Sequence, residues 1–213
     1  MAVYNSELFD AKYGFGGNGR FVDSTADENP FNLTGRTEGG CVEDGSFREG
    51  QFFLNVKQAK SQSDSLRRDY IPWIMNYFTR QSLVNHVESQ SDYTSFARAL
   101  ENIPSFTQHN IHGSGHFGVV GVFGTLGNSA LSPRDPLFYL HHYNLDRVLW
   151  KWQRKDLPGE LHQVGGPITP MDYGGKNVTL DFKINIGKLA SDVTLKELLH
   201  SQGRVLCYGY HGL

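Results

Sequence analysis

The chain has 213 residues, enough for one hydrophobic core, and its 20 basic and 22 acidic side chains give a net charge of -2. Without a concentration of positive charge, nucleic acid is not an expected partner, and no apolar run is long enough to cross a bilayer. The start lacks the basic-then-apolar pattern of a signal peptide, which leaves localisation open. Two cysteines are too few for a disulfide framework. Cys41 and Cys207 could pair, but two free thiols are the preferred interpretation.

Residues 1–60 are rich in glycine, asparagine, aspartate and serine and show little hydrophobic periodicity. This composition predicts loops and turns rather than helices or strands. So long an irregular segment is uncommon in a complete compact domain. We therefore expect it to lie against another part of the molecule.

Helical patterns begin after residue 63. Pro72 opens an apolar stretch that predicts a first helix, and Ser91 or Asp92 can cap a second. Both helices are expected to pack in a bundle, the second through one face that contains Phe96, Leu100 and Ile103. His86 and His109 have no histidine at ligand spacing and are expected at the surface or in loops.

The clearest helix is predicted from Pro136 to about Lys155. Proline suits a first helical turn, and Asp135 can cap the free N–H groups there. Residues at i, i+4 and i+7 spacing predict one buried stripe. His141 is turned about 100° from its neighbour His142 by the helical period, so the two cannot share one role. The stripe contains Phe138, His142, Leu145, Leu149 and Trp152.

Two histidines, His112 and His116, lie four residues apart in a glycine-rich segment. On a helix that spacing brings side chains to about 5–6 Å at Cβ on one face. A histidine in an apolar stripe, such as His142, is more often a hydrogen-bonded core residue than a ligand. Together with the upstream pair, however, it gives three neutral nitrogen donors and an open coordination position. Such a site suits copper or zinc.

The remaining residues predict a small C-terminal element. Residues 178–184 alternate as a strand, and residues 194–199 form a short helix with Asp192 near its start. Tyr208 and Tyr210 then form a Tyr-x-Tyr ending.

These motifs resemble the second copper site, CuB, of the tyrosinase family of type-3 copper proteins. The resemblance is strongest to filamentous-fungal tyrosinase-like enzymes. The family includes tyrosinases, catechol oxidases and, more distantly, hemocyanins, and its core has a similar Tyr-x-Tyr ending. The motifs are His112-x3-His116 and Asp135-Pro136-x-Phe138-x2-His141-His142-x3-Asp146-Arg147.

The resemblance implies a mainly α fold, a helix bundle of the tyrosinase core type with long irregular loops and a small β element near the C-terminus. It implies a single domain over residues 1–213. Within it, residues 1–60 are a loop-rich linker, residues 63–155 are the CuB helical region and residues 156–213 are the C-terminal part.

The resemblance also implies roles for the residues of the copper site. It assigns the metal to His112, His116 and His142. His141 would be hydrogen-bonded away from the metal, and Phe138 would pack over the ligand rings.

Four further residues take roles from the family. Gly113 stands where many monophenol-hydroxylating members have asparagine, which favours diphenol oxidation. Glu101 matches, by order, a glutamate that holds a water near the substrate, although a solvated carboxylate at a helix end is an equal alternative. Asp146 would orient a ligand or anchor the helix, with anchoring preferred. Arg147 is expected to pair with a carboxylate, for which Asp135 is a candidate.

The implied function is a copper-dependent oxidoreductase that oxidises o-diphenols, and in some members monophenols, to o-quinones with dioxygen. The three histidines of the family's first copper site, CuA, have no counterpart, since residues 1–85 contain no histidine. Three alternatives follow: a part of a full enzyme that lacks its N-terminal half, a non-catalytic copper-binding module with one site, or a homodimer with facing sites. A second copper would need ligands from another chain or a missing segment. A zinc hydrolase is disfavoured, because no glutamate follows His112 as in His-Glu-x-x-His sites.

Overall fold

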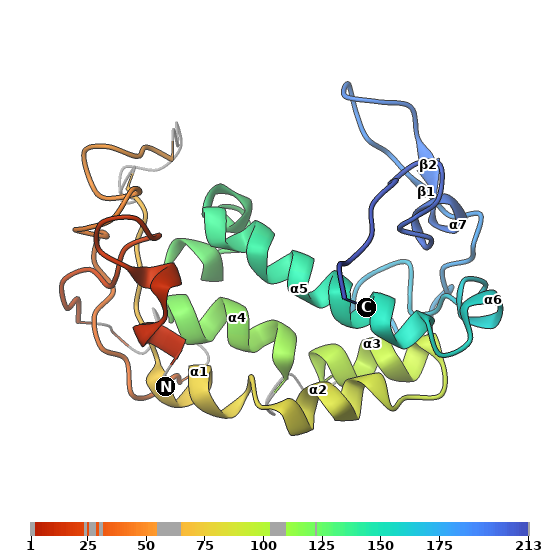
Figure 1. The fold of residues 1–213 in the computed structure, drawn as a ribbon, viewed down its shortest axis with the longest axis horizontal. Coiled ribbons are helices and arrows are strands. Elements are labelled where there is room, and N and C mark those ends of the chain that lie inside the picture. Colours follow the sequence, from red (N-terminus) through yellow and green to blue (C-terminus); the bar gives the residue numbers. More distant parts are fainter. Residues whose placement is uncertain are drawn as a thin grey trace. The chain divides into compact units, whose positions relative to one another are not determined.

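The structure is a computed structural model that describes residues 3–23, 25, 29, 32–54, 65–102, 110–121 and 123–212. This part of the chain is mainly helical with one two-stranded sheet (Figure 1), which confirms the predicted fold class. None of its helices combines the length and apolarity needed to cross a membrane. Neither Cys41 nor Cys207 forms a disulfide in this part of the chain.

The helices and strands have the following bounds. The α-helices are α1 (Pro72–Tyr77), α2 (Gln81–Glu88), α3 (Tyr93–Glu101), α4 (Ile111–Val120), α5 (Pro136–Gln153), α6 (Leu157–Glu160) and α7 (Leu195–Leu198). Four 3-10 turns are η1 (Val3–Asn5), η2 (Glu7–Phe9), η3 (Thr125–Gly127) and η4 (Ser132–Arg134), and the strands are β1 (Lys183–Ile184) and β2 (Val193–Thr194).

The chain divides into two compact units. One contains Met1–Leu83 and Thr107–Asn144, and the other contains Val84–Phe106 and Leu145–Leu213. The single domain expected over residues 1–213, with its division near residues 60 and 155, stays a prediction.

In the first unit, α1 packs against α4. A Cβ on Gly118 would lie 3.1 Å from the side chain of Met75 and 3.2 Å from that of Ile74, so a glycine lets the helices approach closely. The carbonyl of Gly118 also accepts the N–H of Ile71 at 2.8 Å. Helix α4, which contains the histidine pair, therefore packs on the buried side chains of α1.

The predicted start of α5 is confirmed. Its first residue is Pro136, and the carboxylate of Asp135 accepts the N–H of Leu137 at 3.0 Å. The charged partner of Asp135 is Arg68, which corrects the pairing with Arg147 suggested above. Nη2 of Arg68 lies 3.9 Å from Oδ1 of Asp135, and both side chains are fully buried.

Arg68 and Asp69 hold the irregular N-terminal segment, which confirms that this segment lies against another part of the unit. Nη1 of Arg68 donates to the carbonyls of Phe15 at 2.5 Å and Gly16 at 2.6 Å. Asp69 is also fully buried and accepts hydrogen bonds from Arg36 and from the backbone N–H of Thr37 and Glu38. The charged side chains of Arg68 and Asp69 thus form hydrogen bonds with backbone groups of these loops that strand partners would form in a β-sheet.

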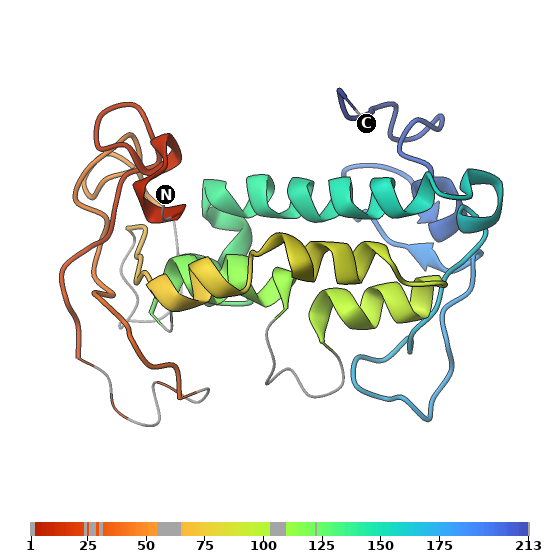
Figure 2. The same ribbon diagram turned by 60° about the horizontal axis from the view of Figure 1, so that its bottom comes forward.

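In the second unit, α3 packs on the C-terminal part of α5 through Phe96 and Trp152, and the end of α2 runs between these two helices in the view of Figure 2. The fully buried ring of Trp152 is 5.0 Å from that of Phe96, and its N–H donates to the carbonyl of Gln90 at 2.8 Å. Asp92, one of the two predicted caps, accepts the N–H of Ser95 at 2.9 Å. Ile103 and His109 lie outside the described residues.

The C-terminal strand is shorter than predicted. Only Lys183 and Ile184 pair with Val193 and Thr194, because the residues before them form a turn. Helix α7 begins after Thr194, whose side chain forms a capping box with Glu197. Asp192 instead accepts a hydrogen bond from Asn185 at 2.9 Å.

Asp146 binds the Tyr-x-Tyr ending. Its Oδ2 accepts hydrogen bonds from the hydroxyls of Tyr208, at 2.6 Å, and Tyr210. This contact supports the anchoring alternative for Asp146.

We expect Asp146→Ala to lower the free energy of unfolding by about 1–3 kcal/mol, because two hydroxyls lose a charged acceptor. Chemical denaturation measures this, with the exposed Asp192→Ala as control; equal effects of both changes would contradict the anchor.

Candidate metal centre

Helix α4 presents two histidines on one face. The side chain of Asn110 caps the N-terminus of α4 by accepting a hydrogen bond from the N–H of Gly113 at 2.5 Å. His112 and His116 are four residues apart, and their ring centroids are 4.9 Å apart. The two rings therefore lie side by side on one face of α4, as the spacing of four residues predicts.

A third ring from α5 meets this pair. Nε2 of His116 lies 3.2 Å from Nε2 of His112 and 3.3 Å from Nε2 of His142. Imidazole nitrogens bind a tetrahedral metal ion at about 2.0–2.1 Å, which separates any two of them by about 3.3 Å. The observed spacings match this edge length, so the three rings fit a single ion.

His141 completes the cluster from a different direction. Among the described residues, the one group of three or more His, Cys, Asp or Glu that could hold an ion is His112, His116, His141 and His142. Nε2 of His141 lies 2.9 Å from the carbonyl of His112, to which it donates its proton. This nitrogen is engaged by the α4 backbone rather than aimed at the other three.

A backbone contact sets the tautomer of the central ring. Nδ1 of His116 lies 2.8 Å from the carbonyl oxygen of Leu126, which can only accept, so Nδ1 carries the proton. The lone pair is then on Nε2, which points at the other rings. In metal sites generally, a hydrogen bond from the ring nitrogen that does not bind the metal orients the histidine.

Burial keeps these rings neutral. It lowers the pKa of His141 to about 3 and that of His142 to about 4, and nearby histidines add to both effects. The pKa of His116 is lowered as well, mainly by burial. Neutral imidazole is the form that binds metal ions, so the lowered pKa values of His116 and His142 favour metal binding at pH 7.

The lowered pKa values predict a pH dependence for the metal-free protein. Unfolded histidines have a pKa near 6.5, so between that value and about pH 4 the unfolded chain binds protons that folded His141 and His142 do not. The free energy of unfolding should therefore fall as the pH falls through this window. Thermal melts at pH 7 and pH 5 in chelator measure it. A smaller pH effect in His141→Asn is expected, and an unchanged one would contradict the assignment.

Phe138 packs over the cluster as expected. Its ring centroid is 4.1 Å from that of His142 and 6.3 Å from that of His116. Tyr139 and Tyr143, on another side of α5, are exposed. The aromatic contact restricts the rotamer of His142 and shields one side of the three nitrogens.

Gly115 has a role that sequence reasoning missed. A Cβ on this residue would lie 2.2 Å from Cε1 and Nδ1 of His141, so only glycine lets that ring lie against α4. The sequence signal was present, since a glycine in the middle of a helix is disfavoured unless something approaches its backbone. The Gly113 site is less crowded: a Cβ there would be 3.0 Å from the Asn110 side chain.

We expect Gly115→Ala to displace His141 and lower the affinity for copper by about 10–100-fold, the range for lost supporting contacts around metal ligands. Equilibrium dialysis measures the affinity. The double variant Gly115→Ala/His141→Ala removes the clashing ring and should recover part of the stability lost in Gly115→Ala. If the double variant is no more stable than Gly115→Ala alone, the clash is not with His141.

Two predicted residues, Glu101 and His86, belong to the second unit. Glu101 is the last residue of α3, in the second unit, and the residues between it and α4 include the undescribed stretch 103–109. Its water-positioning role stays a prediction. His86 is exposed on α2.

This helical fold contains a histidine cluster that could hold a metal ion, and comparison with known proteins gives the family. Residues 2–155 match the model of the common central domain of tyrosinase, so the chain belongs to the tyrosinase family. The predicted resemblance is thereby confirmed, while the restriction to the CuB part stays a prediction.

Curated relatives are fungal. The tyrosinase-like protein phomQ1 of Diaporthe leptostromiformis is 29% identical over 96% of this chain and 52% of its own length. Tyrosinase ustQ of Aspergillus flavus is 28% identical over 99% and 53%. This chain thus spans about half the length of the curated relatives it matches.

A solved structure shares the fold. A polyphenol oxidase (mutant G292N) from Thermothelomyces thermophila superposes with a TM-score of 0.77 and 23% identity, over 98% of this chain and 62% of that one. This chain therefore shares the fold of that polyphenol oxidase over nearly its whole length.

Proposed function

We propose that this chain forms the CuB part of a copper-dependent oxidoreductase of the tyrosinase and catechol oxidase type. Such an enzyme oxidises o-diphenols, and in some cases monophenols, to o-quinones with dioxygen. The observation that carries the proposal is the convergence of the Nε2 atoms of His112, His116 and His142 at 3.2 and 3.3 Å. Copper, when bound there, would supply the exchange of electrons between the phenol and dioxygen.

The residues of the chain would prepare this site. Three neutral nitrogens fit copper by ligand type, since imidazole is a donor that copper prefers. The carbonyl of Leu126 holds the central ring, that of His112 turns His141 aside, and Phe138 covers the ring of His142. These contacts fix the donors before the metal arrives, which lowers the cost of ordering them on binding.

Diphenols are the proposed substrates because of Gly113. This residue follows the first ligand and has no side chain that could accept a proton from a phenol or hold a water. The water-holding role would then rest on Glu101 alone.

A non-catalytic copper-binding module is the second candidate. One observation favours it: the described residues contain a single cluster for a metal ion, and residues 1–85 contain no histidine. A second copper would need ligands from another chain, such as a homodimer partner, or from residues outside this sequence.

Copper titration separates these candidates. The metal is counted per chain by mass spectrometry, the spin per copper is measured by electron paramagnetic resonance, and o-quinone formation from catechol is followed by absorbance. Quinone formation supports the oxidase. One copper with full spin and no quinone supports the module or a CuB part whose second copper site lies outside this chain. Sedimentation with and without copper tests the homodimer. If the protein binds less than one copper per chain, both candidates fail.

A further inference from the structure

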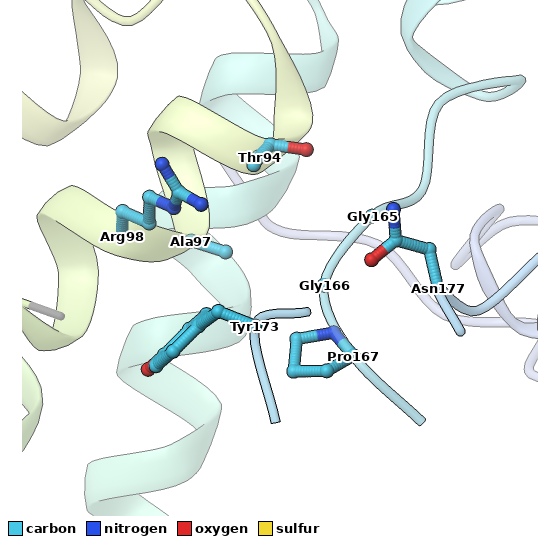
Figure 3. A pocket seen from close by; sticks show the side chains of 8 residues that line it. All are labelled: Thr94, Ala97, Arg98, Gly165, Gly166, Pro167, Tyr173 and Asn177. Carbon is cyan, nitrogen blue, oxygen red and sulfur yellow. The ribbon is translucent and has the colours of Figure 1, made fainter. Parts of the chain in front are cut away.

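The second unit contains a cavity that the proposed copper chemistry does not use. It has a volume of about 170 Å³ and lies between α3 and the loop of residues 165–177 (Figure 3). Thr94, Ala97 and Arg98 line it from the helix, and Pro167 and Tyr173 line it from the loop. A cavity of about 150 Å³ is enough to hold benzene, so this one can hold a single aromatic ring.

The loop wall is fixed by its own contacts. The carbonyl of Gly166 accepts the N–H of Val178 at 2.9 Å, and Pro167 pairs with Asn177 in an isolated β-bridge. A Cβ on Gly165 would lie 2.1 Å from the hydroxyl oxygen of Thr94, so a glycine there lets the loop approach α3. Gly166 has a φ of +99°, a backbone conformation that favours glycine. The cavity is therefore built into the fold.

The chemistry of the lining is one cation beside an aromatic ring. Among the described residues, no carboxylate or carbonyl forms an ion pair or hydrogen bond with the guanidinium of Arg98. Tyr173 is 41% exposed and lines the same cavity from the loop. A guanidinium prefers a planar carboxylate, which it binds through two parallel hydrogen bonds, while aromatic rings pack on one another.

We propose that this cavity binds a small aromatic carboxylate, with the carboxylate on Arg98 and the ring against Tyr173 and Ala97. Binding needs no metal ion, because every group that lines the cavity belongs to α3 or the loop. The proposal is thus independent of the copper site and survives if the copper assignment fails.

Benzoate is the probe, and its dissociation constant is measured by calorimetry on the whole chain in chelator. Arg98→Gln should weaken benzoate binding about tenfold or more, since it removes hydrogen bonds to a charged group. Ala97→Leu should abolish binding by filling the cavity. Benzamide, which has the same shape without the charge, should bind the unmodified chain at least about tenfold more weakly for the same reason.

The matched control is Arg154→Gln, which removes an exposed arginine just beyond the end of α5. It should leave benzoate binding unchanged, and circular dichroism melts should show that all variants fold. The proposal is overturned if benzoate does not bind at millimolar concentration, if Arg98→Gln and Arg154→Gln weaken it equally, or if benzamide binds as well as benzoate.

Discussion

Replacing His142 with alanine is expected to lower the affinity for copper(II) by more than about 100-fold. The loss of a group that merely supports a ligand costs about 10–100-fold, and His142 is proposed as a ligand itself. Its removal leaves two nitrogens from a single helix, 3.2 Å apart, with no donor from α5 at that point. Copper bound per chain after dialysis against a competing chelator measures the effect.

Two further variants give this experiment its controls. His86→Ala removes an exposed histidine on α2 and should leave copper binding unchanged. His141→Ala should weaken binding less than His142→Ala, because Nε2 of His141 is held by the backbone of α4. If His141→Ala has the larger effect, the roles of the two neighbours are reversed and the ligand assignment is wrong.

Replacing Arg68 with methionine is expected to destabilise the fold by about 3–5 kcal/mol, the usual cost of breaking a buried ion pair from one side. The change leaves Asp135 without its cation and the carbonyls of Phe15 and Gly16 without a donor. Burial already raises the pKa of Asp135 against the opposing effect of Arg68. Without Arg68 this pKa should rise further, so the loss of stability should shrink as the pH is lowered.

Urea denaturation at pH 7 and pH 5 measures both expectations. The double variant Arg68→Met/Asp135→Asn keeps an acceptor for the N–H of Leu137 but removes the buried charge, so it should be less destabilised than the sum of the single changes. Arg20→Met, at a largely exposed ion pair, should change stability by no more than about 0.5 kcal/mol. A cost for Arg68→Met equal to that of Arg20→Met would show that Arg68 is not the anchor of the N-terminal loops.

The features that sequence alone predicted are local ones. The start of α5 at Pro136, its cap at Asp135 and the i, i+4 pair on α4 all follow from helical geometry within a few residues. The helical period of α5 also turns the side chains of His141 and His142 in different directions. The family followed from the same short motifs and was confirmed by comparison.

Local reasoning failed where a short segment met competing hydrogen-bond partners. The strand predicted for residues 178–184 shrank to two residues, since the carbonyls of Thr179 and Leu180 accept hydrogen bonds from Phe182 and Lys196 instead of joining a longer ladder. Strand pairing depends on the register with a distant partner, which alternation of side chains does not encode.

By itself, the sequence determined where α1, α3 and α5 begin, which histidines share a face and which family the chain belongs to. Only the tertiary structure decided that Arg68 is buried beneath the N-terminal loops, that Gly115 receives the ring of His141, and that three Nε2 atoms lie 3.2 and 3.3 Å apart. The physical reason is the separation along the chain, since helical periodicity is set by neighbours within one turn. The contacts of Arg68 with the N-terminal loops, of Gly115 with His141 and of His116 with His142 join residues 26 or more positions apart and depend on the packing of whole segments.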